Sequence, residues 1–298
     1  MSHDASQATA QALRRGSSGR LIQQRIAFVV LALSALLVAL PVLYIAVWLV
    51  LQGGPGLSWQ FLTEMPRRRG MEGGILPAIL GTLYLMFGTI AFALPVGVLA
   101  AVYLSEYARP SRLTRLINLS IVNLAGVPSI VYGMFGLGLF VLTLGFGSSL
   151  LSASLTLACQ ALAMVITTSR ESLLAVPRTY REACLAMGVT KWQTTRHVVL
   201  PQAMPGILTG AVLAVGRAAG ETAPILAVGA AFVLPRLPQS PFDQFMALPY
   251  HLYVVATQVP QMPSTVKWSV ALVLVGVVLA FNSAAVLLRL KLRERRYS

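Results

Sequence analysis

Six long apolar runs dominate this sequence and limit what it can fold into. Each is near or above the ~20 residues that a helix needs to cross a ~30 Å hydrocarbon core. None alternates apolar and polar residues as the strands of a membrane barrel do. The runs lie at 26–51, 75–104, 121–144, 149–168, 206–233 and 268–288. We therefore expect an all-α membrane protein with six transmembrane helices.

The distribution of positive charge predicts the orientation of these helices. The chain is 11% charged, well below the ~25% of soluble domains, and its net charge is +14. With the N-terminus in the cytoplasm, the two tails and the loops after the second and fourth runs hold 17 of the 23 Lys and Arg residues. The external segments then hold five. Lys and Arg gather on the cytoplasmic side of membrane proteins, so both termini are expected there and no nucleic-acid partner is implied.

The motifs of several enzyme classes are missing from the sequence. It contains no GxxxxGK[ST] phosphate loop and no HExxH, CxxC or GxSxG motif. The two cysteines and three histidines lack the spacing of a metal site. We expect a non-catalytic chain that binds no cofactor itself. Energy for uphill transport would come from a partner or from an ion gradient.

Arg217 and Glu221 are charged residues inside the fifth apolar run. Counted from residue 206, Arg217 lies 11 residues in, or ~16 Å, which is near the middle of a ~30 Å core. A charge at that depth is costly and usually faces a cavity or a substrate route. The spacing of four would place Glu221 on the same helical face. Two interpretations stay open: a structural ion pair, or an arginine that meets a tetrahedral oxyanion along a path.

The segment 170–205 is basic and amphipathic, and lies on the predicted cytoplasmic side. Pro177 and Gly188 are expected to bound one short helix, and a second helical piece of about 190–199 is expected to end at Pro201. Two helices with an exposed apolar side need a partner groove or a lipid surface.

Two glycine pairs in the fifth run have GxxxG spacing. They are Gly206 with Gly210 and Gly216 with Gly220. Small residues at this spacing let a second helix approach closely. Chance spacing in a chain with 24 glycines is the equally weighted alternative.

The segment 170–205 also resembles a known motif. Glu182, Ala183 and Cys184, then Gly188, then Val198 to Pro201 are similar to the EAA loop of ABC importer permeases. The departures from its pattern are Cys184 for alanine and Val198 for isoleucine. In that family the loop forms a coupling helix in a cleft of the ATPase subunit. The resemblance implies ATPase docking by Glu182, Ala183, Cys184, Gly188, Leu200 and Pro201.

Four further segments, at 73–85, 95–108, 123–140 and 216–226, resemble phosphate importer permeases of the PstA type. The likeness covers about 70–290. It implies a multi-pass subunit of the bacterial inner membrane, embedded in lipid and paired with a homologous permease. The other implied partners are an ATPase dimer that binds ATP and Mg²⁺ and an external phosphate-binding protein. By motif position, Arg217 and Glu221 are implicated in phosphate passage.

The expected organisation is a basic cytoplasmic tail at 1–25, which we expect to be flexible, a first helix with its external loop at 26–72, a permease core at 73–290 and a basic tail at 291–298. The function indicated is a phosphate permease driven by a partner ATPase. Alternatives are a permease for another oxyanion, a gradient-driven secondary transporter, or a membrane scaffold. The secondary transporter leaves the EAA-like loop unexplained, and a scaffold has no need of charges in the membrane.

Overall fold

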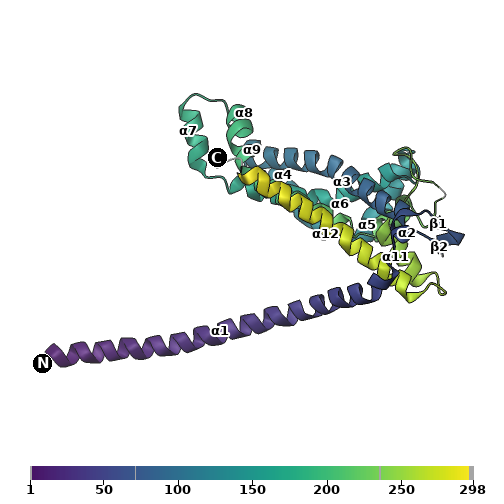
Figure 1. Ribbon diagram of the computed structural model, residues 1–298. Coiled ribbons are helices and arrows are strands. Elements are labelled where there is room, and N and C mark those ends of the chain that lie inside the picture. The colour runs from purple at the N-terminus through teal and green to yellow at the C-terminus, as the bar shows by residue number, and fades with distance from the viewer. Residues whose placement is uncertain (1, 71, 235, 295–298) are drawn as a thin grey trace. The chain divides into compact units, whose positions relative to one another are not determined.

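The computed structural model describes residues 2–70, 72–234 and 236–294, and the chain divides into two parts at residue 52. The first part is the helix α1 (Ser2–Gly53) (Figure 1). The helix begins at Ser2, so it includes most of the basic tail expected at 1–25, whose flexibility stays a prediction. No proline precedes Pro41 to interrupt it. Residues 23–56 are apolar enough to cross a membrane.

The second part is a bundle of long helices. These are α3 (Leu76–Val102), which continues as the π-helix η3 (Tyr103–Tyr107), α6 (Leu150–Leu174), α9 (Leu200–Ala218) and α12 (Ser264–Glu294). Helix α6 packs against both α3 and α9, and α12 packs against α9. Alanines fill the centre of this contact, where small side chains let helix backbones approach (Ala93, Ala158, Ala161 and Ala214).

The fold confirms the all-α membrane prediction. Five helices of the described residues are long and apolar enough to span a membrane, and a bent helix pair brings the number to as many as six. The orientation of the spans stays a prediction.

The third apolar run, expected as one transmembrane helix at 121–144, is a bent pair of helices that can count as one span. It consists of α4 (Arg112–Ala125), α5 (Ser129–Gly136) and the π-helix η4 (Leu137–Thr143), with a bend of 105° after α4. Pro128 stands at the break, where it has no N–H to continue the helix. The hydroxyl of Tyr132 donates to the Leu124 carbonyl at 2.8 Å and so ties the two arms together.

The fifth apolar run is a helix for only part of its length. Helix α9 ends at Ala218, and a turn leads to the short α10 (Ala223–Val228), so the continuous helix expected over 206–233 is wrong. Gly220 favours a break, and Pro224 would clash with the carbonyl four residues before it in a continuing helix.

The helix also begins earlier than expected. The α8 (Lys191–Thr194) and η5 (Thr195–Val199) segments run directly into α9, so the predicted end at Pro201 is wrong. Pro201 lies in the first turn of α9, next to the π-helical η5. Inside a continuous helix a proline removes one backbone hydrogen bond, and a local π-helical turn such as η5 helps to accommodate that loss.

Three of the four GxxxG glycines lie at close contacts. A Cβ on Gly206 or Gly210 would overlap Ser172 or Thr168 of α6, and one on Gly216 would meet Asn282 of α12. Gly220 lies in the turn after α9 and approaches no other helix. The spacing in Gly206 and Gly210 therefore serves helix packing, as the motif suggests.

We expect Gly210→Val to lower the stability of the bundle. The larger side chain has to displace Thr168 in a tight contact, and such overpacking costs about 1–3 kcal/mol. Thermal unfolding of the purified protein in detergent measures the effect. Gly276→Val in α12 is the matched control, since nothing lies within 4 Å of a Cβ there, and an equal loss in both variants would contradict the packing role.

Short elements gather at one end of the second part, with α7 (Arg178–Ala186) and α8 at the other (Figure 1). They include η1 (Gly54–Gly56), α2 (Trp59–Thr63), η2 (Arg68–Gly70) and α11 (Leu248–Thr257). Strands β1 (Pro66–Arg67) and β2 (Glu72–Gly73) pair antiparallel, and β3 (Ala230–Ala231) pairs parallel with β4 (Phe245–Met246).

The arginine triplet 67–69, which departs from the charge rule, has partners at this end. Arg68 lies 2.7 Å from Glu72 and Arg67 lies 3.7 Å from Glu64, both at the surface. Local acidic residues therefore offset two of these positive charges.

His251 is a buried histidine on α11. Its ring stacks on Phe232 with centroids 5.1 Å apart, and its Nδ1 lies 3.3 Å from the Phe232 carbonyl. A carbonyl only accepts, so Nδ1 carries the proton of the neutral ring. Burial lowers the pKa of His251 to about 4, against the smaller opposing effect of that hydrogen bond.

The stability of the fold should therefore fall in mild acid. Below about pH 6.5 the unfolded chain protonates His251, whereas the folded chain resists protonation until about pH 4. The free energy of unfolding should fall by up to about 1.4 kcal/mol per pH unit between about pH 6.5 and about pH 4, and the fall stops at lower pH. Melting temperatures at pH 7.5 and 5.0 test this. His251→Phe should flatten the dependence, whereas the exposed His197→Gln should keep it.

Candidate functional site

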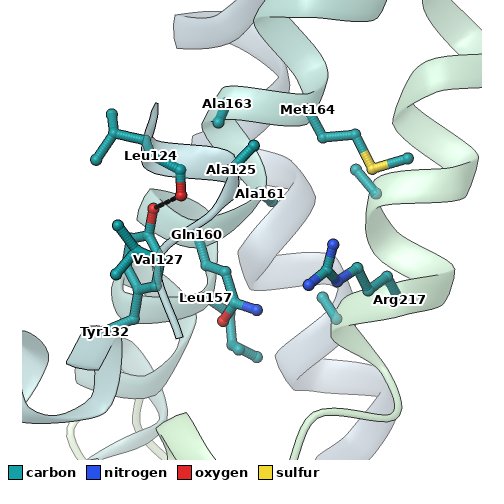
Figure 2. Close-up of a pocket in the computed structure, with 12 residues that line it drawn as sticks. Leu124, Ala125, Val127, Tyr132, Leu157, Gln160, Ala161, Ala163, Met164 and Arg217 are labelled. Atoms are coloured by element: carbon teal, nitrogen blue, oxygen red, sulfur yellow. Dashed lines mark hydrogen bonds between the residues drawn. The ribbon is translucent and has the colours of Figure 1, made fainter. Parts of the chain in front are cut away.

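A small cavity lies in the second part of the chain, between the α4–α5 bend, α6 and α9. Its volume is about 40 Å³, which is room for a few water molecules. Most of its lining is apolar, and three polar side chains enter it from different helices (Figure 2). They are Tyr132 of α5, Gln160 of α6 and Arg217 of α9.

Arg217 lies in the last turn of α9 and not within a continuous helix. Its predicted depth near the middle of the membrane stays a prediction. Its side chain is 63% exposed, and its Nε lies 3.4 Å from Oε1 of Glu221, whose side chain is 17% exposed. Glu221 belongs to the turn between α9 and α10 and not to the same helical face. A positive charge at a helix C-terminus is favourable, because the helix dipole is negative there.

Gln160 is a site residue that the sequence prediction did not include. Its Nε2 donates to Oε1 of Glu221 at 2.8 Å, so Glu221 is held by both Gln160 and Arg217. Among the described residues, the long contact with Glu221 is the one hydrogen bond of the Arg217 guanidinium. The rest of the guanidinium points toward the cavity, as Figure 2 shows. This arrangement can donate several hydrogen bonds to an anion.

The short helix predicted between Pro177 and Gly188 is confirmed as α7. Gly188 has a φ of +77°, and two hydrogen bonds close the helix end: Gly188 N to Leu185 O at 3.0 Å and Val189 N to Cys184 O at 3.1 Å. This is a Schellman ending, which needs a left-handed residue at the position of Gly188. Thr190 and Gln193 then form a capping box that starts α8.

The residues predicted for docking do not all face the same way. Glu182, Ala183 and Gly188 are exposed, whereas Cys184 is buried against the permease itself. Leu200 and Pro201 are half-buried in the first turn of α9. The large exposed apolar side chains of α7, α8 and their connection are Tyr180, Leu185, Met187 and Trp192.

An ion pair fixes α7 to the end of α3. Arg181 of α7 lies 2.7 Å from Glu106 of η3, and their side chains are only 19% and 7% exposed. The same guanidinium donates to the carbonyls of Leu173 and Val176 at 2.9 and 2.8 Å. The next residue of η3, Tyr107, lies under the Lys191 ammonium of α8 at 5.1 Å. We call Arg181 and Glu106 the coupling anchor.

The described residues contain no group of three or more His, Cys, Asp or Glu side chains that could hold a metal ion. Cys159 and Cys184 are both free thiols.

Comparison with known proteins agrees with these observations. Residues 93–294 match the family described as "Binding-protein-dependent transport system inner membrane component". The chain is 32% identical to the Bacillus subtilis "Probable ABC transporter permease protein YqgI" over 89% of its own length and 95% of that protein. It is 34% identical to the Mycobacterium tuberculosis "Phosphate transport system permease protein PstA 1" over 75% and 73% of the two chains.

Solved structures show the same fold at low sequence identity. A chain of the MetNI methionine ABC transporter in an inward-facing conformation aligns with a TM-score of 0.56 and 24% identity, covering 74% of this chain and 94% of that one. A chain of a bacterial alginate ABC transporter aligns with a TM-score of 0.61 and 13% identity, over 85% and 92%.

The helical bundle with its candidate membrane spans, the mostly apolar cavity with three polar side chains and the projecting α7 and α8 agree with the class of membrane permeases. This chain belongs to the family of inner membrane components of binding-protein-dependent transport systems. The scaffold alternative is thereby excluded, and membership argues against the gradient-driven transporter. The family match also confirms the fold expected from the EAA-like loop.

Proposed function

We propose that this chain is a permease subunit that carries inorganic phosphate through the inner membrane as part of an ATP-driven importer. The observation that carries the proposal is Arg217, an accessible guanidinium at a cavity in the bundle. Relatives named as phosphate transport permeases support the choice of substrate. Arg217 supplies donors to the phosphate oxygens, and Glu221 keeps the guanidinium in place while limiting how tightly an anion is held.

The proposed energy source is a separate ATPase that docks on α7 and α8. The exposed Tyr180, Leu185, Met187 and Trp192 offer an apolar surface that fits a groove in such a partner. Glu182, Ala183 and Gly188 are exposed beside this surface. The ATPase dimer would bind ATP and Mg²⁺, and this chain would be non-catalytic. A homologous permease and an external phosphate-binding protein complete the proposed complex.

We place the end of the bundle with α7 and α8 in the cytoplasm. This end holds most of the basic residues of the second part, and three of them (Arg112, Arg115 and Arg170) line one open hollow beside α4. Lys and Arg favour the cytoplasmic side. Four predicted spans lie between the N-terminus and this loop, and two lie between the loop and the C-terminus. Both numbers are even, so both termini are cytoplasmic.

Uptake into proteoliposomes tests the proposal. The whole transporter is reconstituted with its ATPase and external binding protein, and radiolabelled phosphate is followed with and without ATP. We expect ATP-dependent accumulation that unlabelled phosphate inhibits and excess sulfate does not. If sulfate accumulates and phosphate does not, the chain is a permease for another oxyanion. If an ion gradient drives accumulation in the absence of ATP, ATP coupling is refuted.

A further inference from the structure

Gln160 has a fixed amide orientation in the cavity. Glu221, paired with Arg217, can only accept hydrogen bonds through its carboxylate. The NH₂ group of Gln160 must therefore face Glu221, as it does at 2.8 Å. A flipped amide would set the carbonyl oxygen against the carboxylate. The acceptor atom of Gln160 is consequently turned away from the ion pair.

This acceptor atom is buried and unpaired. Oε1 of Gln160 has no hydrogen-bond partner among the described residues. Buried polar atoms in proteins are nearly always satisfied by protein, water or ligand. Gln160 lies in the wall of the cavity, where its amide and the Arg217 guanidinium approach each other (Figure 2). The remaining lining is mostly apolar and offers Oε1 no donor.

A donor set and a free acceptor together match a particular kind of anion. Near neutral pH, inorganic phosphate keeps at least one P–OH group and can donate a hydrogen bond, whereas sulfate has lost both protons. Arg217 can donate to the oxygens of either anion. The carbonyl of Gln160 attracts a P–OH group but repels an unprotonated anionic oxygen. A polar group left unpaired in a desolvated site discriminates strongly between such ligands.

We infer that Oε1 of Gln160 accepts a hydrogen bond from the P–OH group of the passing anion and makes the cavity selective for protonated oxyanions over sulfate. The inference rests on the proposed phosphate function. Oε1 of Gln160 is buried in this arrangement, so the cavity must open at Gln160 before the anion can reach it. The α4–α5 bend, held by the Tyr132 hydrogen bond, forms one wall of the cavity.

The test compares two readouts in the complete transporter. The first is the maximal rate of ATP-driven phosphate uptake with saturating binding protein, expected to fall about tenfold in Gln160→Met. The second is the melting temperature of the purified transporter without binding protein, in high phosphate or sulfate at matched pH and ionic strength. The melting temperature in phosphate minus the melting temperature in sulfate should be about 2 °C larger in wild type than in the variant.

Two further variants separate the acceptor from a merely structural role. Gln160→Lys can still donate to Glu221 but has no acceptor, so it too should lose the phosphate-minus-sulfate difference. Gln258→Met, outside the cavity, should behave like wild type. The inference fails if wild type shows no such difference or if Gln160→Lys keeps it. If the wild-type transporter takes up no phosphate, the proposed function itself is refuted.

Discussion

Arg181→Ala is expected to disable transport while leaving the transmembrane bundle inserted. The substitution removes the positive partner of the coupling anchor and leaves the Glu106 carboxylate, 7% exposed, without its counter-charge. It also removes the side-chain donor of the Leu173 and Val176 carbonyls at the loop that leads into α7. Breaking a buried ion pair in this way costs about 3–5 kcal/mol.

The functional loss should exceed the loss of stability, because the coupling anchor is a direct link between α7 and the end of α3. We expect movement of a docked ATPase to pass from α7 into α3, because the coupling anchor joins the two directly. Without it α7 can shift without moving α3. We expect ATP hydrolysis to continue in the reconstituted transporter while phosphate uptake falls more than tenfold. Both rates are measured on the same proteoliposomes.

A neutral double variant is the control for the anchor. Arg181→Met with Glu106→Gln removes both charges, and replacing a buried pair by neutral groups is often nearly neutral for stability. The melting temperature should therefore recover relative to Arg181→Ala, while coupling stays impaired. Arg178→Ala, an exposed neighbour on the same helix, controls for loss of positive charge. Tight coupling in Arg181→Ala would show that the anchor does not transmit movement.

Hydropathy predicted the spans but not where they break. A run of apolar residues reports that a segment can lie in lipid, and it does so equally for a straight helix, a bent pair and a helix with a turn. Pro128 and Pro224 lie inside apolar runs and mark both breaks. Their effect was hard to predict because prolines are common in membrane helices, where neighbouring helices satisfy the freed backbone groups.

The site could be predicted only where a local signal exists. Arg217 and Glu221 stand out as charges in an apolar run, and Gly188 as a helix ending. Gln160 meets Glu221 from 61 residues away, and Glu106 meets Arg181 from 75 residues away. No local spacing reports such contacts, because they depend on how α3, α6, α7 and α9 pack. The only sequence signal for Gln160 was that it is the one amide side chain in the apolar run 149–168.

Arg217→Ala should reduce phosphate uptake by about 10- to 100-fold, the worth of the charge-assisted hydrogen bonds that the guanidinium can give to an anion. The protein should still insert and assemble, because the side chain is 63% exposed and contributes little to packing. Arg217→Lys should recover part of the rate, since lysine keeps the charge but lacks the planar fork of donors. Uptake rates, normalised to the amount of assembled transporter, measure both effects.

The loss in Arg217→Ala has two possible sources that a second variant separates. Removing the guanidinium also leaves the Glu221 carboxylate alone beside the cavity, where it would repel any anion. Arg217→Gln with Glu221→Gln removes both charges at once. If Arg217 acts on the anion directly, the double variant stays slow, because no cation faces the path. Recovery of the wild-type rate in the double variant would reduce Arg217 to a counter-charge for Glu221, and the anion would then have to be bound elsewhere.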